Sequence, residues 1–481
     1  MRKTLLPILS IFMGALLFSS CEKAETTPEE DPTPAGPTYT AADFTLNWKK
    51  SWGTIYADDF GGGVMDVSGN MYFTGATQPD GSYADIFVTK INLATQTLVW
   101  SKSFDAGNQD FQASPGENGH TQGGAGSRNI AIDNNGDIYI CGNTKQGFYE
   151  VVVMKINSSG TVLWQKYWEG NASGLANGEA KAYSLDVAGG KVFVTGQLAS
   201  SSAFLLALDA SNGSISAATE LDISAGYNDR GYTVKSPDGN TVYIAGWEGA
   251  NNSGMVAKFK NGGANLVWAK RIDIGYAARF SDIDVDASEN LYLGADHRGV
   301  SSYVGVVKTD SSGTVLWSKK FQGLANDRNN ISCLRLINNN LYVGGKGSFD
   351  GYDNSAWGDG LLLKFDLNGN LLKQYNFFTA ELSSDRCGER IEGIFSYNGA
   401  LIVAGETWSE GTQIDGKWYI PAGTVTGAAL NSTNAVSPYV ATNNGVFSTT
   451  APAANTLSNA VNNMSAGTQG SCDIMINSIT E

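Results

Sequence analysis

Apolar and polar residues alternate in short stretches that return down the chain about every 40–50 residues. The clearest copy, residues 85–104 (DIFVTKINLATQTLVWSKSF), predicts a strand, a tight polar turn and a second strand that carries Trp100. Self-similarity of this kind is typical of a radial β-repeat, in which each copy belongs to one blade. Variants of the copy occupy 150–168, 254–272, 303–321 and, in weaker form, 359–377.

Seven units can be counted between the termini, each with an inner strand, a short turn and a second strand of the type IYICG. The turns before the second strands are rich in Asn and Gly, which accept positive φ and suit tight hairpins. In the third and sixth units Ala217 and Leu372 stand in place of the tryptophan, and no stretch predicts a long amphipathic helix. The second strands lie at 71–75, 138–142, 192–196, 242–246, 291–294, 341–345 and 401–405.

The two ends of the chain hold complementary halves of one repeat. FTLNWKKSWG (44–53) matches the tryptophan strand without its first half, and DIMINSITE (473–481) matches the first half alone. Pairing of these two segments would close a ring of blades and remove the exposed edges of an open array. The predicted fold is therefore all-β, a seven-bladed β-propeller closed by pairing of its N-terminal and C-terminal strands.

The repeat pattern GxxYxxG…DxFVxKxxxxGxxxW, present over residues 44–481, resembles the bacterial β-propeller repeat of the SBBP type. That resemblance implies a seven-bladed propeller and no particular activity. The repeat is also similar, more weakly, to quinoprotein propellers, whose blades carry a DxxxGxxxW turn.

The composition agrees with many short strands, because 58 of the 481 residues are Gly and only 16% are charged. The formal net charge of −15 argues against nucleic-acid binding, which depends on Lys and Arg neutralising phosphates. With only two histidines, His120 and His297, the chain offers little for a His-based metal site or a Ser-His-Asp triad.

The N-terminus carries a targeting segment rather than part of the fold. Arg2 and Lys3 precede an apolar run at 5–18 that is too short for an ordinary transmembrane helix. The run ends in LFSSC, which resembles a bacterial lipoprotein signal (residues 1–21) and implies lipidation of Cys21. A plain secretory signal with a chance cysteine is the alternative.

Residues 22–42 are rich in Glu, Thr and Pro and predict a disordered acidic linker before a propeller domain at 43–481. The start of the linker, EKAETTPEED, resembles the tether of Bacteroidetes lipoproteins that are carried to the outer face of the outer membrane. The predicted location is therefore the outer membrane, through a lipid anchor, with the domain exposed at the cell surface.

The remaining cysteines lack the close spacing of a zinc site. Cys141 and Cys333 lie within apolar strand patterns and are expected in the core. Cys387 and Cys472 flank the last repeat and could pair outside the cytoplasm, but the sequence alone does not establish that disulfide.

The connections between the predicted strands fall into two classes. In a propeller the turns after the first and third strands of each blade share one face, and here they are uniformly short. The long connections belong to the opposite face, where binding residues are expected to gather. They are 105–127, 169–181, 346–358, 379–390 and a long insertion at about 406–471. A lid, a partly disordered excursion and an interaction surface are all open interpretations of that insertion.

A basic residue recurs shortly before the inner strand of most blades: Arg128, Lys181, Arg230, Arg279, Arg328 and Arg390. One interpretation is a partial ring of positive charge at the channel mouth, suited to bidentate contact with a carboxylate or sulfate. The interpretation we favour is a set of ion pairs between loops, because acidic residues adjoin these cations in NDR (228–230), NDR (326–328) and SSDR (383–386).

Aromatic residues form the second candidate ligand site. Trp247, Trp357 and Trp408 lie in or next to long connections, and Trp418 and Tyr419 lie in the insertion. A flat aromatic ring on a rigid loop can hold a sugar by apolar contact. The alternative, which we favour, is that these rings pack beneath their own loops.

No cofactor is predicted, although calcium stays open. Asp350, Asp353 and Asp359 have a spacing that loosely resembles a calcium loop, but the terminal bidentate Glu is missing. The 47 acidic residues offer too many carboxylate pairs to single out a glycosidase site. No glycine-rich loop follows a strand and opens a helix to bind phosphate.

Together these features favour a non-enzymatic binding or scaffold protein at the cell surface, for a glycan or an outer-membrane protein. The alternative is an envelope enzyme on a propeller scaffold, either polysaccharide-cleaving or quinone-dependent. The scarcity of histidine and the lack of a catalytic cluster that breaks the repeat favour binding.

Overall fold

The computed structural model is all-β throughout the residues that it describes. These residues are 40–41, 45–52, 58–77, 85–105, 110–112, 128–145, 149–168, 170, 179–199, 201–223, 227–272, 278–297, 303–322, 330–347, 359–378, 389–407, 417–420, 424–427, 432–436, 439–442, 447–448, 453–456 and 473–480.

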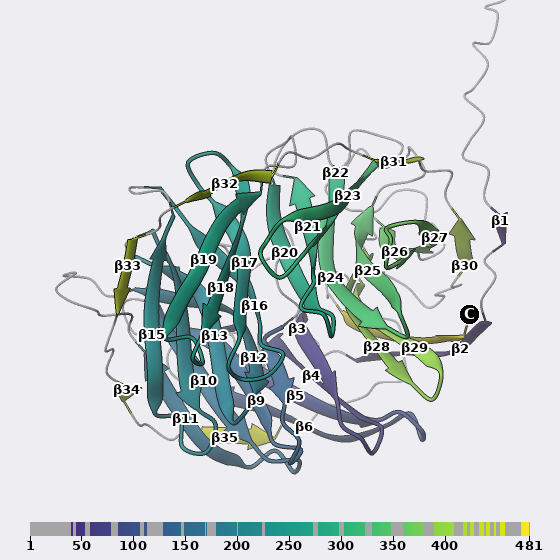
Figure 1. Cartoon of the computed structure of the whole chain (residues 1–481). Coiled ribbons are helices and arrows are strands. Elements are labelled where there is room, and N and C mark those ends of the chain that lie inside the picture. Colours follow the sequence, from purple (N-terminus) through teal and green to yellow (C-terminus); the bar gives the residue numbers. More distant parts are fainter. Residues whose placement is uncertain are drawn as a thin grey trace, which may run out of the picture. The chain divides into compact units, whose positions relative to one another are not determined.

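The strands form seven antiparallel sheets, which are the seven blades of a β-propeller, as predicted (Figure 1). Each of the first four blades is given from its inner to its outer strand. Blade 1 is β3 (Asp58–Met65), β4 (Asn70–Thr77), β5 (Asp85–Asn92) and β6 (Thr97–Asp105). Blade 2 is β8 (Ile130–Ile132), β9 (Ile138–Lys145), β10 (Tyr149–Ile156) and β11 (Val162–Trp168), with β7 (Asp110–Gln112) also paired to β9. Blade 3 is β12 (Ala180–Ala188), β13 (Lys191–Leu198), β14 (Ala203–Asp209) and β15 (Ile215–Asp222). Blade 4 is β16 (Arg230–Lys235), β17 (Val242–Glu248), β18 (Ser253–Lys260) and β19 (Asn265–Ile272).

The last three blades follow the same order. Blade 5 is β20 (Ala278–Val285), β21 (Leu291–His297), β22 (Tyr303–Thr309) and β23 (Val315–Gln322). Blade 6 is β24 (Asn330–Ile337), β25 (Asn340–Gly347), β26 (Asp359–Asp366) and β27 (Leu371–Phe378). Blade 7 is β28 (Glu389–Tyr397), β29 (Ala400–Thr407), β36 (Asp473–Thr480) and β2 (Thr45–Trp52).

Blade 7 joins the two ends of the propeller, which confirms the predicted closure. β36 pairs with β29 on one side and with β2 on the other. Asn47 of β2 donates hydrogen bonds from Nδ2 to Thr480 Oγ1 at 2.9 Å and to Ser478 Oγ at 3.3 Å. Blade 7 also meets blade 1, where the backbone N–H of Phe60 donates to Glu406 Oε1 at 3.2 Å. The ring of blades therefore closes through strands from both ends of the chain.

The recurring Lys and Trp of the repeat link blades 1, 2 and 5 to the blades that follow them. In blade 1, Lys90 Nζ and Trp100 Nε1 both donate to Ser158 O in a turn of blade 2, each at 3.2 Å. Lys90 also lies over the ring of Tyr72, 4.9 Å from its centroid. The equivalent Lys and Trp of blades 2 and 5 make the same bonds to turns of blades 3 and 6. In these three blades the Lys and Trp of the motif therefore hold a turn of the neighbouring blade.

In blades 1, 3, 4, 6 and 7 a glycine at the end of the second strand lies beside a bulge in the inner strand, and in blade 5 Ala295 holds the same position. In blade 4 the register between β16 and β17 shifts between Gly231 and Thr233, which leaves Tyr232 as the extra residue. A Cβ built on Gly246 would lie 1.9 Å from Arg230 O, so no larger residue fits there. The same shift occurs in blades 1, 3, 5, 6 and 7, and it places equivalent residues of these inner strands at one level.

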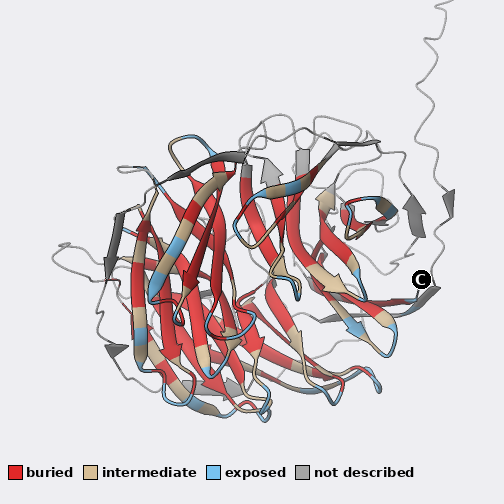
Figure 2. Cartoon of the chain, viewed as in Figure 1, coloured by how far each residue is buried: buried red, intermediate tan, exposed pale blue. Residues whose placement is uncertain are grey.

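The apolar core lies between neighbouring blades, and the central strands are buried on both faces (Figure 2). Between blades 2 and 3, for example, Val151 and Val153 of β10 belong to the same buried cluster as Leu206 and Leu208 of β14. The buried, free thiols of Cys141 and Cys333 confirm the prediction that both lie in the core. Burial on both faces explains why the second strands are apolar at nearly every position.

Short strands from the 406–471 insertion run along the outer edges of the blades (Figure 1). Each pairs antiparallel with the outermost strand of one blade, in order from blade 6 back to blade 1. They are β30 (Lys417–Ile420), β31 (Thr424–Gly427), β32 (Ser432–Val436), β33 (Tyr439–Thr442), β34 (Phe447–Ser448) and β35 (Ala453–Thr456). We call these six strands the outer strap. The sequence pattern did not anticipate it.

The outer strap occupies sheet edges that would otherwise expose unpaired backbone groups. Such edges are templates for pairing with other chains. Within the part of the chain that the structure describes, β2 of blade 7 is the one outermost blade strand without a fifth strand beside it. The sheet of blade 6 has a sixth strand as well, because β1 (Thr40–Ala41) pairs with β30.

Replacing residues 408–472 by a two-residue Asn-Gly turn is expected to leave a folded propeller that self-associates. The replacement is sterically feasible because Thr407 and Asp473 are register partners on β29 and β36. All seven blades keep their four strands, but six outer edges lose their cover. Light scattering after gel filtration measures the association, with the intact chain at the same concentration as the control. A variant that stays monomeric would show that the strap does not protect these edges.

Among the described residues, no helix is long and apolar enough to cross a membrane. The predicted signal at 1–21 and the linker at 22–42, apart from the strand at 40–41, lie outside these residues.

Candidate functional site

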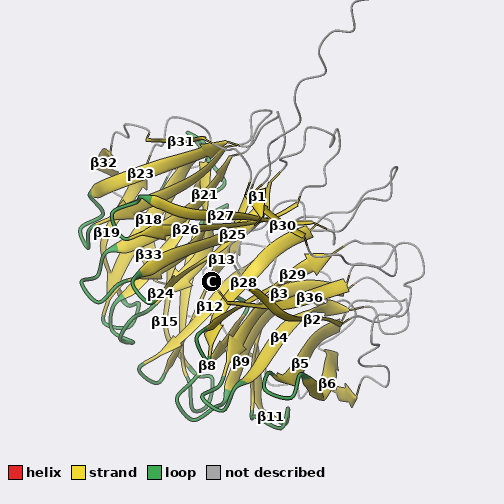
Figure 3. Ribbon diagram, turned by 90° about the vertical axis from the view of Figure 1, so that its right-hand side faces the viewer, coloured by secondary structure: helices red, strands yellow, loops and turns green. Residues whose placement is uncertain are grey.

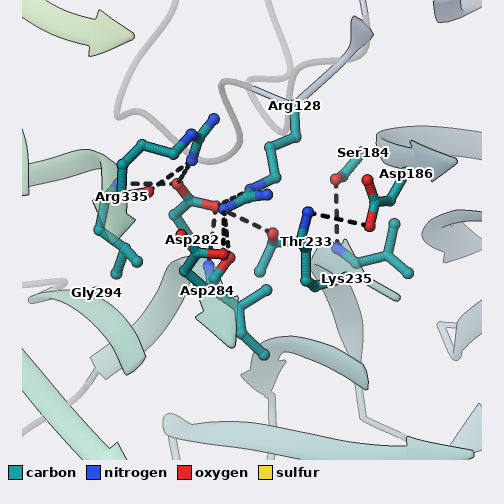
Figure 4. A network of polar contacts seen from close by, with 12 residues as sticks. Arg128, Ser184, Asp186, Thr233, Lys235, Asp282, Asp284, Gly294 and Arg335 are labelled. Carbon is teal, nitrogen blue, oxygen red and sulfur yellow. Dashed lines mark hydrogen bonds and ion pairs between the residues drawn. The ribbon is translucent and has the colours of Figure 1, made fainter. Parts of the chain in front are cut away.

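A network of buried charges joins inner strands that are not neighbours in the ring (Figure 4). Arg128, two residues before β8 of blade 2, reaches Asp282 of blade 5 with an Nε–Oδ1 distance of 2.5 Å. Arg335 of blade 6 meets the other oxygen of the same carboxylate at 2.8 Å. Thr233 of blade 4 donates from Oγ1 to Asp282 Oδ1 at 3.3 Å. Four of the seven blades are therefore tied to one carboxylate.

Short acidic and hydroxyl side chains of one inner strand also accept hydrogen bonds from the inner strand of the next blade. The backbone N–H of Ser236 donates to Asp186 at 2.8 Å, and that of Leu336 donates to Asp284 at 2.9 Å. The N–H of Leu334 donates to Asp282 at 2.8 Å. The innermost strand of each blade is a sheet edge, so its outward N–H groups need partners from outside the sheet. These carboxylates supply them.

The electrostatics of the network follow from its burial and its pairing. Burial acts to raise the pKa of Asp282, but the guanidinium groups of Arg128 and Arg335 outweigh it and hold that pKa below the usual range. The pKa of Arg128 is raised by Asp282 and Asp284 although its burial opposes this. At blade 7, burial raises the pKa of Glu406 above its ordinary value, with Arg390 opposing.

The structure places most of the predicted basic residues at one equivalent position. Lys181, Arg230, Arg279 and Arg390 each stand two residues before the bulge of an inner strand. Arg128 belongs to the charged network instead, and Arg328 lies outside the described residues. At the same position blade 6 carries Asn330.

Each described cation of this set already contacts the protein. Lys181 Nζ lies 3.3 Å from Glu179 and over the ring of Tyr149. Arg390 Nη1 lies 3.3 Å from Glu392 Oε1 and 3.9 Å from Glu406 Oε2. Arg230 lies over the ring of Trp247, and Arg279 over that of Tyr232, each 5.5 Å from the centroid. All three arginines are buried. Ligand binding by these residues stays a prediction.

Of the three tryptophans predicted to form the aromatic platform, the structure describes only Trp247. It is buried and forms a small cluster with Tyr183 and Tyr232 of the inner strands. The rings of Tyr183 and Tyr232 lie 5.6 Å apart. Trp357 and Trp408 lie outside the described residues, and Trp418 and Tyr419 are strand residues of β30. Sugar binding by these rings is likewise still a prediction.

Sequence reasoning missed Asp282, Tyr183 and Tyr232. A signal for the two tyrosines was present, because each follows a basic residue by two positions, at 181–183 and at 230–232. Nothing local marks Asp282, since its partners come from three other blades.

In the described ranges, no group of three or more His, Cys, Asp or Glu side chains could hold a metal ion. Asp350 and Asp353 of the candidate calcium loop lie outside those ranges, and Asp359 begins β26. Cys21, Cys387, Cys472 and His120 also lie outside them, and His297 ends β21.

No family model and no curated protein matches the chain. Solved structures that it is similar to include BamB from Moraxella catarrhalis, at 14% identity and a TM-score of 0.40 over 78% of this chain and 99% of that one. They also include a protein of unknown function from Dyadobacter fermentans, at 12% identity and a TM-score of 0.39 over 68% and 96% of the two chains. A DUF4221 family member from Bacteroides vulgatus matches at 9% identity and a TM-score of 0.31 over 64% and 92%. At these values the similarity carries no functional argument, and the fold rests on the strand pairing.

Proposed function

We propose that this protein is a surface-exposed outer-membrane lipoprotein, of the Bacteroidetes type with SBBP-like repeats, that binds a partner as a non-catalytic scaffold. The observation that carries the proposal is the asymmetry of the connections. The turns after the first and third strands of each blade are short, and most of the described loops lie together on one side of the blades (Figure 3). The connections at 106–127, 348–358, 379–388 and 408–472 all begin and end on the opposite side, which we call the loop face.

The charges at the inner strands support a scaffold rather than a catalyst. Asp282 is fully buried, and both of its oxygens have partners. A general acid or base must reach a substrate proton, which a carboxylate enclosed by two guanidinium groups does not do. Such a network instead keeps the blades in fixed positions, so that the connecting loops are held on a rigid support.

The loop face supports a protein partner better than a glycan held by the predicted cations and rings. Arg230, Arg279, Arg390 and Trp247 are each less than a tenth exposed and contact other side chains of the propeller. A glycan would have to displace these contacts, whereas a protein can bind the connections that surround them.

One experiment tests both the anchor and the binding face. Cys21→Ser is expected to move the protein from the membrane fraction to the soluble fraction, because it removes the site of lipidation. The released protein is then expected to bind isolated outer membranes saturably. Replacing residues 348–358 by a Gly-Ser linker should weaken this binding at least tenfold, while replacing the Asn338–Asn339 turn by Asn-Gly on the opposite side should not.

Two outcomes would contradict the proposal. Membrane retention of Cys21→Ser would exclude the lipid anchor. Absence of any saturable binding by the released protein would exclude an outer-membrane partner. Equal membrane binding by the loop variant and the turn variant would show, more narrowly, that the connection at 348–358 is not part of the binding face.

A further inference from the structure

The outer edge of β2 in blade 7 differs from the outer edges of the other blades. Among the strands that the structure describes, the other six outermost strands each pair with a strand of the outer strap, and β2 does not. The strap covers the second half of each strand, which leads toward the loop face, as at residues 102–105 of β6 in blade 1. An edge strand presents backbone N–H and C=O groups that need partners, so blade 7 offers one position for a fifth strand.

The first half of each outermost strand is protected by a different device. In all seven blades the outermost strand has one extra residue near its start, where its register with the third strand shifts. Such a bulge interrupts the ladder and turns the edge away from other strands. In β2 the extra residue is Asn47, which is exposed. The part of this edge that stays open to pairing is therefore residues 48–52.

Comparison with blade 1 shows which residues of β2 hold the position that the strap covers elsewhere. Trp48 directly follows the extra residue of its strand, as Trp100 does in β6. Residues 50–52 therefore correspond to 102–104 of β6, which pair with residues 454–456 of the strap. Three residue pairs are enough for a strap strand there, so a short strand can also occupy this position on β2.

We propose that the second half of β2 pairs antiparallel with the same segment of a second copy of this chain, with Ser51 opposite its own copy at a two-fold axis. This register places Lys50 opposite Trp52 of the partner subunit, and the partner subunit's Lys50 opposite Trp52. Lysine opposite tryptophan is a favourable neighbour across strands, because the cation can lie over the ring. The repeat uses the same cross-strand pair within four of its blades, at Lys90–Trp100, Lys155–Trp164, Lys258–Trp268 and Lys308–Trp317.

The sequence of β2 also selects this register and limits the assembly to two chains. Pairing centred on Lys49 or on Lys50 would place a lysine opposite its own copy, which is unfavourable, whereas pairing centred on Ser51 places no lysine directly opposite another. The pair uses the open edge of both chains, and the strap covers the other six, so assembly closes at the dimer. This goes beyond the proposed docking of a partner on the loop face and does not depend on it.

Sedimentation velocity of residues 22–481 over a concentration series tests the proposal, with a reducing agent present so that no disulfide links the chains. A reversible equilibrium between monomer and dimer is expected, without larger species. At about 0.1 mM protein, even a dissociation constant near 1 mM leaves about 15% of the chains paired, so a weak dimer is still measured. The variant without residues 408–472 exposes six further edges and should instead form larger species.

A charge exchange at Ser51 locates the contact. Ser51→Asp and Ser51→Lys each place like charges opposite one another at the two-fold axis, so each should raise the dissociation constant about fivefold or more. An equimolar mixture of the two variants places Asp opposite Lys and should restore dimerisation at least to the level of the parent. The matched control is Ser216→Asp, an exposed serine at the bulge of the outermost strand of blade 3, which should leave the equilibrium unchanged.

The mixture also separates a lost contact from a damaged fold, because a misfolded variant would not be rescued by the opposite charge. A parent that stays monomeric over the whole series would overturn the proposal. So would a dimer that both Ser51 variants form as well as the parent does, since the contact would then lie on another surface. Failure of the mixture to restore dimerisation would likewise overturn the pairing centred on Ser51.

Discussion

Removal of β2 (Thr45–Trp52) is expected to destabilise the propeller by roughly 5 kcal/mol or more, at about 1 kcal/mol for each strand hydrogen bond lost. β2 is the outermost strand of blade 7, and its register with β36 runs from Thr45 opposite Thr480 to Trp52 opposite Ile474. Without it, β36 becomes the outer edge of blade 7 and the two ends of the ring are no longer joined by strand pairing. Urea unfolding followed by tryptophan fluorescence measures the loss.

The matched control removes residues 22–38, which lie before the first described strand. That deletion is expected to leave the unfolding midpoint unchanged. Equal midpoints for the two deletions would show that terminal pairing does not stabilise the ring.

Asp282→Ala is expected to cost about 3–5 kcal/mol of stability at neutral pH, because it leaves the buried charges of Arg128 and Arg335 without their carboxylate. It also removes the acceptor for the backbone N–H of Leu334. Asp284→Ala on the same strand is the control. Asp284 accepts hydrogen bonds from the backbone N–H groups of Leu336 and Val285 but lies 3.9 Å from Arg128, so its loss should cost less. In a double-mutant cycle, Arg128→Met with Asp282→Ala should cost less than the sum of the two single changes.

The effect of Asp282→Ala should depend on pH in a defined direction. The pKa of Asp282 in the folded protein lies below its usual value. Its contribution is therefore complete above the unfolded-state pKa of about 3.9 and is lost as the pH falls through the lower folded-state pKa. The stability difference between the parent and Asp282→Ala should narrow when urea unfolding is repeated in acid below about pH 4. A difference that is constant from pH 7 into this range would mean that the carboxylate charge contributes nothing.

The repeated local pattern made the fold predictable. Short apolar or alternating strand patterns, Asn and Gly in the turns, and matching half-repeats at the two termini all depend on residues close in sequence or on whole-repeat comparison. Closure through blade 7 followed from such a comparison, because the segments at 44–53 and 473–481 complete one copy of the repeat.

The outer strap was not predictable in this way. Its strands are two to five residues long, too short to show alternation, and their sequence is rich in Ala, Thr, Ser and Asn. They are strands because the outer edges of blades 1 to 6 offer them backbone partners, not because their side chains specify a strand.

By itself the sequence determined the all-β class, the seven blades, the closure and the equivalent positions that carry Lys, Trp and the basic residues. Only the tertiary structure decided what those positions contact. It buried Arg230, Arg279 and Arg390 against other side chains and brought Arg128 of blade 2 to Asp282 of blade 5. The reason is physical. A repeat fixes each blade through local periodicity, whereas the centre of a ring is shared by residues hundreds of positions apart, whose pairing depends on distance in space.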